Sequence, residues 1–321
     1  MRRFLPFVLL CGLLLAGCAS APEPGQGSGG VTIEHVFGRT TVPPDPVRVV
    51  TLGVTDADAV LALGVTPVAL TGYGFYGEQG GLGPWARPLV QGSPVLLDST
   101  EPDLEQIAGL APDLIVGVSA GFEQDVYDRL SAIAPTVARP VGTVAYAVPR
   151  DDQTRVIARA LGREADGERL IAQANAAFAE AVAANPGFAG RTGTAVLPYD
   201  GKYGAYTPGD SRGQVMAALG FSLPPAVAAR DTGERFYVEV APEQAGIMDG
   251  DVLVMLADQP AARAAVDADP VLQQLPVVTD GRMVVPDLDT RGAMTYNSVL
   301  SVPYALDSLV PQLAAAVSKA G

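Results

Sequence analysis

The feature that most limits the possible folds of this chain is its pattern of two blocks of alternating strands and helices. A long stretch without strands separates the two blocks. Short apolar runs predict buried strands in the first block over 48–53, 67–71, 113–117 and 135–140. Helices are expected between them over 56–63, with Asp56 as its N-cap, 103–110 and 125–133. In the second block we expect strands over 193–198, 251–256 and 282–285, and helices over 212–219 and 301–317. Such alternation favours parallel sheets, so the chain is predicted to fold as two α/β lobes.

The stretch from Asp151 to Ala184 contains no proline, and its apolar residues recur mostly at helical spacing. It predicts one connecting helix over 150–187, roughly 50 Å long at 1.5 Å per residue, which Gly162 and Gly167 could bend or break. The predicted lobes therefore cover 31–149 and 188–321.

The first 18 residues have the form of a bacterial export signal. Arg2 and Arg3 precede an apolar run, Leu5 to Leu15, which is too short to span a bilayer comfortably. The following sequence, LAGC, resembles the lipobox at which lipoproteins are cut before a lipid-carrying cysteine. We expect a signal peptide over 1–17, lipidation of Cys18, and a flexible tether over 18–30. This places the protein on the outer face of the bacterial cytoplasmic membrane.

Composition excludes several function classes. With 48% hydrophobic and 17% charged residues the chain is not disordered, and its net charge of −14 argues against nucleic acid as a partner. The single histidine, His35, makes a zinc site improbable, and no resident metal or cofactor is expected. The only other cysteine, Cys11, lies in the removed segment, so no disulfide is expected in the monomer.

Two short motifs suggest chemistry that their surroundings do not support. Residues 72–77 fit the dinucleotide pattern GxGxxG, but the glycine-rich segment after them cannot form the helix which that pattern requires. Residues 117–121 fit the hydrolase pattern GxSxG around Ser119. An α/β-hydrolase needs a histidine after the nucleophile in the chain, and His35 lies far before it, so catalysis is not expected. A secreted esterase and a scaffold lipoprotein without a ligand remain the alternatives from other classes.

Four segments resemble the iron–siderophore and cobalamin binding proteins of ABC importers. They are RVVTLGVTDADAVLALGVTPV at 48–68, PDLEQIAGLAPDLIV at 102–116, YTPGDSRGQVMAALG at 206–220 and LPVVTDGRMVV at 275–285. The resemblance implies two lobes joined by one rigid helix, small closure around a ligand in the cleft, and delivery to a membrane permease. It implies a ferric siderophore as ligand, with haem or cobalamin as alternatives, and docking of Glu105 and Glu243 on permease arginines.

Ligands of parallel sheets bind beyond the carboxyl ends of strands, where this chain carries most of its tyrosines. Flat rings bury much area at low entropic cost, and arginines would attract an anionic ferric complex. The predicted ligand-binding residues are Tyr73, Phe75, Tyr76, Trp85, Ser119, Phe122, Tyr146, Tyr199, Tyr203, Tyr206, Arg235, Arg291 and Tyr296. Arg230 and Lys202 are further candidate cations.

The chain departs from the receptors of hydroxamate siderophores. Those receptors carry an arginine just before Thr-Glu-Pro and a tyrosine after Ser-Ala-Gly, where this sequence has Ser99 and Phe122. Both departures argue against the hydroxamate mode and leave the siderophore class open. His35 is expected to lie in a leading β-hairpin as a structural residue, while a tyrosine could still ligate haem iron.

Overall fold

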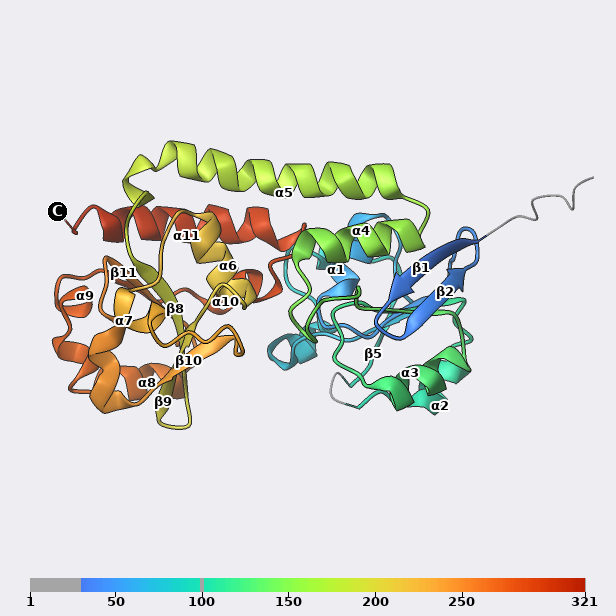
Figure 1. Cartoon of the computed structure of the whole chain (residues 1–321), viewed down its shortest axis with the longest axis horizontal. Coiled ribbons are helices and arrows are strands. Elements are labelled where there is room, and N and C mark those ends of the chain that lie inside the picture. The colour runs from blue at the N-terminus through green and yellow to red at the C-terminus, as the bar shows by residue number, and fades with distance from the viewer. Residues whose placement is uncertain (1–29, 99–100, 321) are drawn as a thin grey trace, which may run out of the picture.

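The computed structural model describes residues 30–98 and 101–320, which form two α/β lobes side by side (Figure 1). The two-lobed α/β class predicted from the sequence is therefore confirmed. The signal peptide over 1–17, Cys18, the tether up to residue 29 and Ser99 lie outside the described residues. Among the helices that the structure describes, none is long and apolar enough to cross a membrane.

The N-terminal lobe is built on a parallel sheet in the order β5-β4-β3-β6-β7. Its strands are β3 (Val49–Thr51), β4 (Ala69–Leu70), β5 (Val95–Leu96), β6 (Leu114–Gly117) and β7 (Thr136–Ala138). A leading antiparallel hairpin consists of β1 (Val31–His35) and β2 (Gly38–Val42). The helices are α1 (Asp56–Ala62), α2 (Leu104–Gly109), α3 (Gln124–Ser131) and α4 (Arg150–Ala160). Short 3₁₀ segments, η1 (Gly74–Gln79) and η2 (Arg87–Leu89), follow β4.

The sheet of the C-terminal lobe is mixed, in the order β10-β9-β8-β11-β12. Its strands are β8 (Gly193–Tyr199), β9 (Lys202–Tyr206), β10 (Tyr237–Val240), β11 (Val252–Met255) and β12 (Met283–Val284). The expected all-parallel sheet is wrong for this lobe, because β9 turns back on β8 and β10 then pairs antiparallel with β9. The turn residues Asp200 and Gly201 have φ of 44° and 71°, the left-handed pair that a tight hairpin requires.

The helices of the C-terminal lobe cover both faces of this sheet. They are α6 (Ser211–Ala218), α7 (Pro225–Ala228), α8 (Pro260–Ala268), α9 (Pro276–Thr279), α10 (Leu288–Tyr296) and α11 (Ser301–Val317). Three 3₁₀ segments complete the lobe, namely η3 (Pro186–Phe188), η4 (Pro242–Met248) and η5 (Leu272–Gln274).

The single helix expected over 150–187 is two helices, α4 and α5 (Glu164–Ala184), because the chain turns at Gly162, whose φ is 66°. Only α5 bridges the lobes, and at 1.5 Å per residue its 21 residues span roughly 30 Å. Helix α4 packs on the N-terminal lobe, where Ile157 and Ala158 are fully buried. The expected cap is also wrong, since Thr55 precedes α1 and Asp56 is its first residue.

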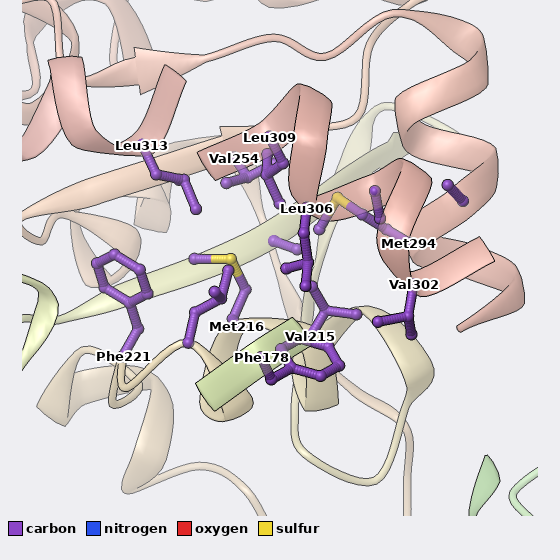
Figure 2. Packing of buried hydrophobic residues seen from close by; sticks show 14 of the residues in the cluster. Phe178, Val215, Met216, Phe221, Val254, Met294, Val302, Leu306, Leu309 and Leu313 are labelled. Carbon is purple, nitrogen blue, oxygen red and sulfur yellow. The ribbon is translucent and has the colours of Figure 1, made fainter. Parts of the chain in front are cut away.

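Helix α5 is anchored in the core of the C-terminal lobe. Figure 2 shows Phe178 from α5 beside Val215 of α6, with Leu306 and Val302 of α11 close by. Burial of these side chains contributes about 1.5–3 kcal/mol each to folding. The same helix runs back over the N-terminal lobe along α4 (Figure 1). The bridge is therefore fixed at both ends by packed side chains.

Candidate functional site

The carboxyl ends of the N-terminal strands surround a pocket of about 270 Å³, which we call the N-lobe pocket. Residues following β3, β4, β5 and β6 line it, as expected for a parallel sheet. Its lining residues are Leu52, Val54, Thr71, Asp98, Glu101, Pro102, Ala120, Gly121, Phe122, Glu123, Asp125, Val126 and Tyr146. Tyr146 is 66% exposed, and its ring lies against Gly121, where even a Cβ atom would be only 2.2 Å away.

A smaller cavity of about 40 Å³, lined by residues of both lobes, lies beside this pocket. It shares Val54 and Tyr146 with the N-lobe pocket and also contains Ser119. Its remaining walls are Thr55, Tyr73, Val148, Arg150, Gln153, Ser211, Gln214, Tyr296 and Asn297. The N-lobe pocket thus lies close to the boundary between the lobes.

The buried carboxylate of Asp56 connects the loops that follow β3 and β6. It accepts backbone hydrogen bonds from Gly53, Val118 and Ser119 at 2.9–3.1 Å, and a side-chain bond from Gln153 of α4 at 2.7 Å. Burial raises the pKa of Asp56, while these donors act in the opposite direction. The network fixes the loop that carries Ser119, which has an exposed fraction of 8%.

The lobes touch along a row of aromatic and polar side chains, which we call the aromatic seam. Its members are Asp58, Tyr73, Phe75, Tyr76 and Trp85 from one lobe and Asp289, Arg291, Tyr296, Ser298 and Tyr304 from the other. Trp85 Nε1 and Ser298 Oγ both donate to one oxygen of Asp58, at 2.7 and 2.5 Å.

Hydroxyl groups reinforce the aromatic seam. The Tyr296 hydroxyl donates to the carbonyl of Gly81 at 2.7 Å, and the Tyr76 hydroxyl donates to Asp289 at 2.9 Å. Both rings are almost fully buried, with exposed fractions of 3% and 2%. Burial raises the pKa of Tyr296 well above its usual range. Tyr76 and Tyr296 therefore connect the lobes through hydrogen bonds, and Tyr296 also lines the 40 Å³ cavity.

Arg291 is also part of the aromatic seam between the lobes. Its guanidinium lies 4.5 Å from the ring centre of Phe75 and 2.8 Å from Asp258, which follows β11. Phe75 in turn stacks on Tyr73 at 5.3 Å. The aromatic loops that the sequence assigned to ligand binding contact one another across the lobes, and their ligand role stays a prediction.

The tyrosines of the C-terminal lobe separate onto opposite faces of the β8–β9 hairpin. Tyr203 is buried in the core beneath α8, and its hydroxyl donates to Asp269 at 2.5 Å. Tyr206 packs on the other face, under the guanidinium of Arg212 at 3.7 Å. The hydroxyl of Tyr199 donates to Glu239, which is also bonded to Lys202. Strand alternation explains this separation, because successive side chains point to opposite faces.

Several predicted residues lie away from the N-lobe pocket. Arg235 is exposed beside β10, and Arg230 donates to Gln244. Glu105 is exposed in the first turn of α2, and Glu243 is exposed on η4. Glu243 also lines a cavity of about 630 Å³ between the β8–β9 hairpin and α8, together with Tyr199 and Tyr203.

Sequence reasoning missed part of this arrangement. Asp58 and Ser298 were not singled out, and Thr71, Arg212 and Gln153 were not considered. Only Thr71 carried a usable signal, since it ends a predicted strand whose carboxyl end faces the site. His35, by contrast, is structural as predicted, since it is 2% exposed and contacts Thr40 at 2.9 Å.

The comparisons with known proteins agree with this geometry. Residues 49–288 match the model of the periplasmic binding protein family, three quarters of the chain. The chain belongs to this family. A periplasmic solute binding protein from Mycobacterium smegmatis is 33% identical, with a TM-score of 0.80 over 90% of this chain and 99% of that one. The Fe(3+)-citrate-binding protein YfmC of Bacillus subtilis is 29% identical over 88% of both chains.

A periplasmic binding protein binds its ligand without transforming it. One further solved member is PiaA of Streptococcus pneumoniae in complex with ferrichrome, which is 25% identical, with a TM-score of 0.76 over 91% of this chain and all of that one. Ser119 fits the role of a binding protein, because its hydroxyl accepts from the Thr55 amide at 3.4 Å and no histidine faces it. Among the described residues no group of three or more His, Cys, Asp or Glu could hold a metal ion.

Proposed function

We propose that this protein is the extracytoplasmic receptor of an ABC importer and captures a ferric siderophore or ferric citrate complex. The observation that supports this proposal most is the N-lobe pocket, which combines strand ends and an exposed aromatic ring and lies close to the lobe boundary. Relatives that bind ferric citrate and ferrichrome support iron complexes as the ligand class. Iron would arrive inside its own chelator, which agrees with the lack of a metal-binding group among the described residues.

Within the pocket we assign ligand contact to Phe122 and Tyr146, and we assign Ser119 and Tyr73 to ligand contact from the neighbouring 40 Å³ cavity. This proposal depends most on Tyr146. Its large ring is 66% exposed, and a ligand that covered the ring would bury that apolar area. The rings of Tyr76, Tyr203, Tyr206 and Tyr296 are buried and that of Trp85 is half-buried, and we leave all five out of the proposed ligand contacts.

The proposal includes a membrane anchor and a permease. Cys18 would carry the lipid, and Glu105 and Glu243, one exposed acid on each lobe, would meet arginines of the permease dimer. Two such contacts on separate lobes would orient the receptor and report whether the lobes have closed.

The test is a calorimetric titration of the full chain, purified in detergent, with ferric citrate, several ferric siderophores, haem and cobalamin. We expect one ferric complex to bind with micromolar or tighter affinity. Tyr146→Ala should weaken it by about tenfold, while Val47→Ala, which removes an exposed apolar group outside the pocket, should not. If haem alone binds, the receptor function stands but its ligand is haem. If none of the titrated compounds binds, the proposal is rejected.

A further inference from the structure

The N-lobe pocket is acidic. Asp98, Glu101, Glu123 and Asp125 line it, and none of its described lining residues is Lys, Arg or His. A carboxylate repels an anion and attracts a cation most strongly where protein replaces water around it. The sequence predicted that arginines would attract an anionic ferric complex. The carboxylates of the N-lobe pocket would instead repel such a complex.

Four of the predicted or neighbouring cations are already paired with carboxylates within the protein. Their shortest distances to a carboxylate are 2.8 Å for Arg291 and Asp258, 2.7 Å for Arg212 and Asp210, 2.8 Å for Lys202 and Glu239, and 2.9 Å for Arg150 and Asp151. The ammonium of Lys202 lowers the pKa of Glu239, as expected for such a pair. A neutralised cation attracts an anionic ligand weakly, and using it would require breaking a pair.

One buried polar group in the pocket lacks a partner. Thr71 lines the N-lobe pocket and is 1% exposed, yet its hydroxyl has no hydrogen-bond partner among the described residues. Buried hydroxyl groups are normally bonded, and an unbonded one costs about 1–3 kcal/mol. This hydroxyl, independent of the acidic rim, indicates that a polar ligand group completes the pocket.

We propose that the ligand is a ferric complex with a positive charge, whose cationic end group enters the N-lobe pocket. This inference rests on the proposed function and narrows its substrate class. Glu101 and Glu123 supply the opposite charge, Thr71 supplies a hydrogen bond, and the rings of Phe122 and Tyr146 cover the chelate. At about 270 Å³ the pocket has room for a polar end group such as an alkylammonium.

Charge can be tested with two ligands that share one chelate. Ferrioxamine B carries a free ammonium group, and its N-acetylated form has the same trihydroxamate core without that charge. We expect calorimetry on the full chain in detergent to give roughly tenfold tighter binding of the charged form at low salt. The preference should shrink at high salt, because exposed charges are screened. Ferric citrate, which is anionic, should bind more weakly than either.

Variants locate the effect in the pocket. Glu101→Gln with Glu123→Gln should reduce the preference for the charged form several-fold, because two of the four acids that line the pocket lose their charge. Glu180→Gln, which removes one exposed charge on α5 outside the pocket, should keep the preference. Thr71→Val should weaken the binding of both forms of ferrioxamine B to the same extent. The substitution deletes the hydroxyl and leaves the charge of the pocket unchanged.

The outcomes separate this inference from the function on which it rests. Equal affinity for both forms of ferrioxamine would overturn the cationic ligand. So would tightest binding of ferric citrate, with a further gain in affinity in the Glu101→Gln and Glu123→Gln double variant. Either outcome leaves the receptor function intact. Failure of every ferric complex to bind rejects both.

Discussion

The indole Nε1 of Trp85 donates a 2.7 Å hydrogen bond to Asp58, a carboxylate that is fully buried where the two lobes meet. Ser298, from the opposite lobe, donates to the same oxygen. The second oxygen, Oδ1, has no hydrogen-bond partner among the described residues. Burial raises the pKa of Asp58 from an ordinary 3.8 to about 6. The lobes are thus joined through a titratable group that forms no ion pair with any cation in residues 30–98 and 101–320, and the hydroxyl of Tyr296 is a further titratable group nearby.

This raised pKa makes the stability of the aromatic seam depend on pH. The folded protein holds the Asp58 proton more tightly than the unfolded chain, so the contribution of this group is full below about pH 4 and is lost as the pH rises through about 6. Relative to wild type, Asp58→Asn should therefore gain unfolding free energy as the pH rises from 4 to 7. Urea unfolding followed by Trp85 fluorescence at several pH values measures this, and parallel curves would contradict it.

The carboxylate of Asp56 should be among the costliest polar groups to remove. Asp56→Ala leaves three backbone N–H groups and the amide of Gln153 without their acceptor in a buried site. We expect the unfolding free energy to fall by about 3 kcal/mol. The matched change Glu180→Ala on the exposed face of α5 should alter it by less than about 0.5 kcal/mol. Chemical denaturation of both variants checks the difference.

Close packing in the aromatic seam predicts that Gly292 cannot be enlarged. A Cβ atom there would lie 2.3 Å from the hydroxyl of Tyr76, which is held by Asp289. Gly292→Ala should lower the unfolding free energy by about 1–3 kcal/mol. Gly109→Ala in α2 is the control, since its Cβ would enter open space, and it should be neutral or slightly stabilising. Equal melting temperatures of the two variants would contradict the predicted clash.

Docking on the permease should be separable from ligand binding. Because Glu105 and Glu243 are exposed and outside the N-lobe pocket, Glu105→Ala and Glu243→Ala should leave the ligand affinity unchanged. Uptake into proteoliposomes that contain the permease should fall several-fold for each, and further for the double variant. Glu180→Ala should transport normally. A loss of ligand affinity in either docking variant would instead place that glutamate in the binding site.

Local patterns predicted most of the fold, because each strand and helix is encoded within a short segment. Helix α11 was predicted over 301–317, the residues that it occupies, because Val302, Leu306, Leu309 and Leu313 repeat at helical spacing. Strands β9 and β10 were missed, although Asp200-Gly201 is a strong hairpin sequence.

The site was harder to predict, since it depends on contacts between distant segments. The strand-end rule found Phe122 and Tyr146. It could not reveal that Trp85 and Tyr296 pack between the lobes, or that Arg291 is paired with Asp258. Alternation along the β8–β9 hairpin, which was not recognised, decides that Tyr203 enters the core.

The chain passes from one lobe to the other only along α5, and this has a consequence for the order of folding. Every strand of the first sheet precedes residue 139, and every strand of the second follows residue 192. Each lobe can therefore complete its sheet from a continuous segment, and the first can do so while the second is still emerging from the export channel. The bond between Ser298 and Asp58 joins residues 240 positions apart, so the contact between the lobes forms last.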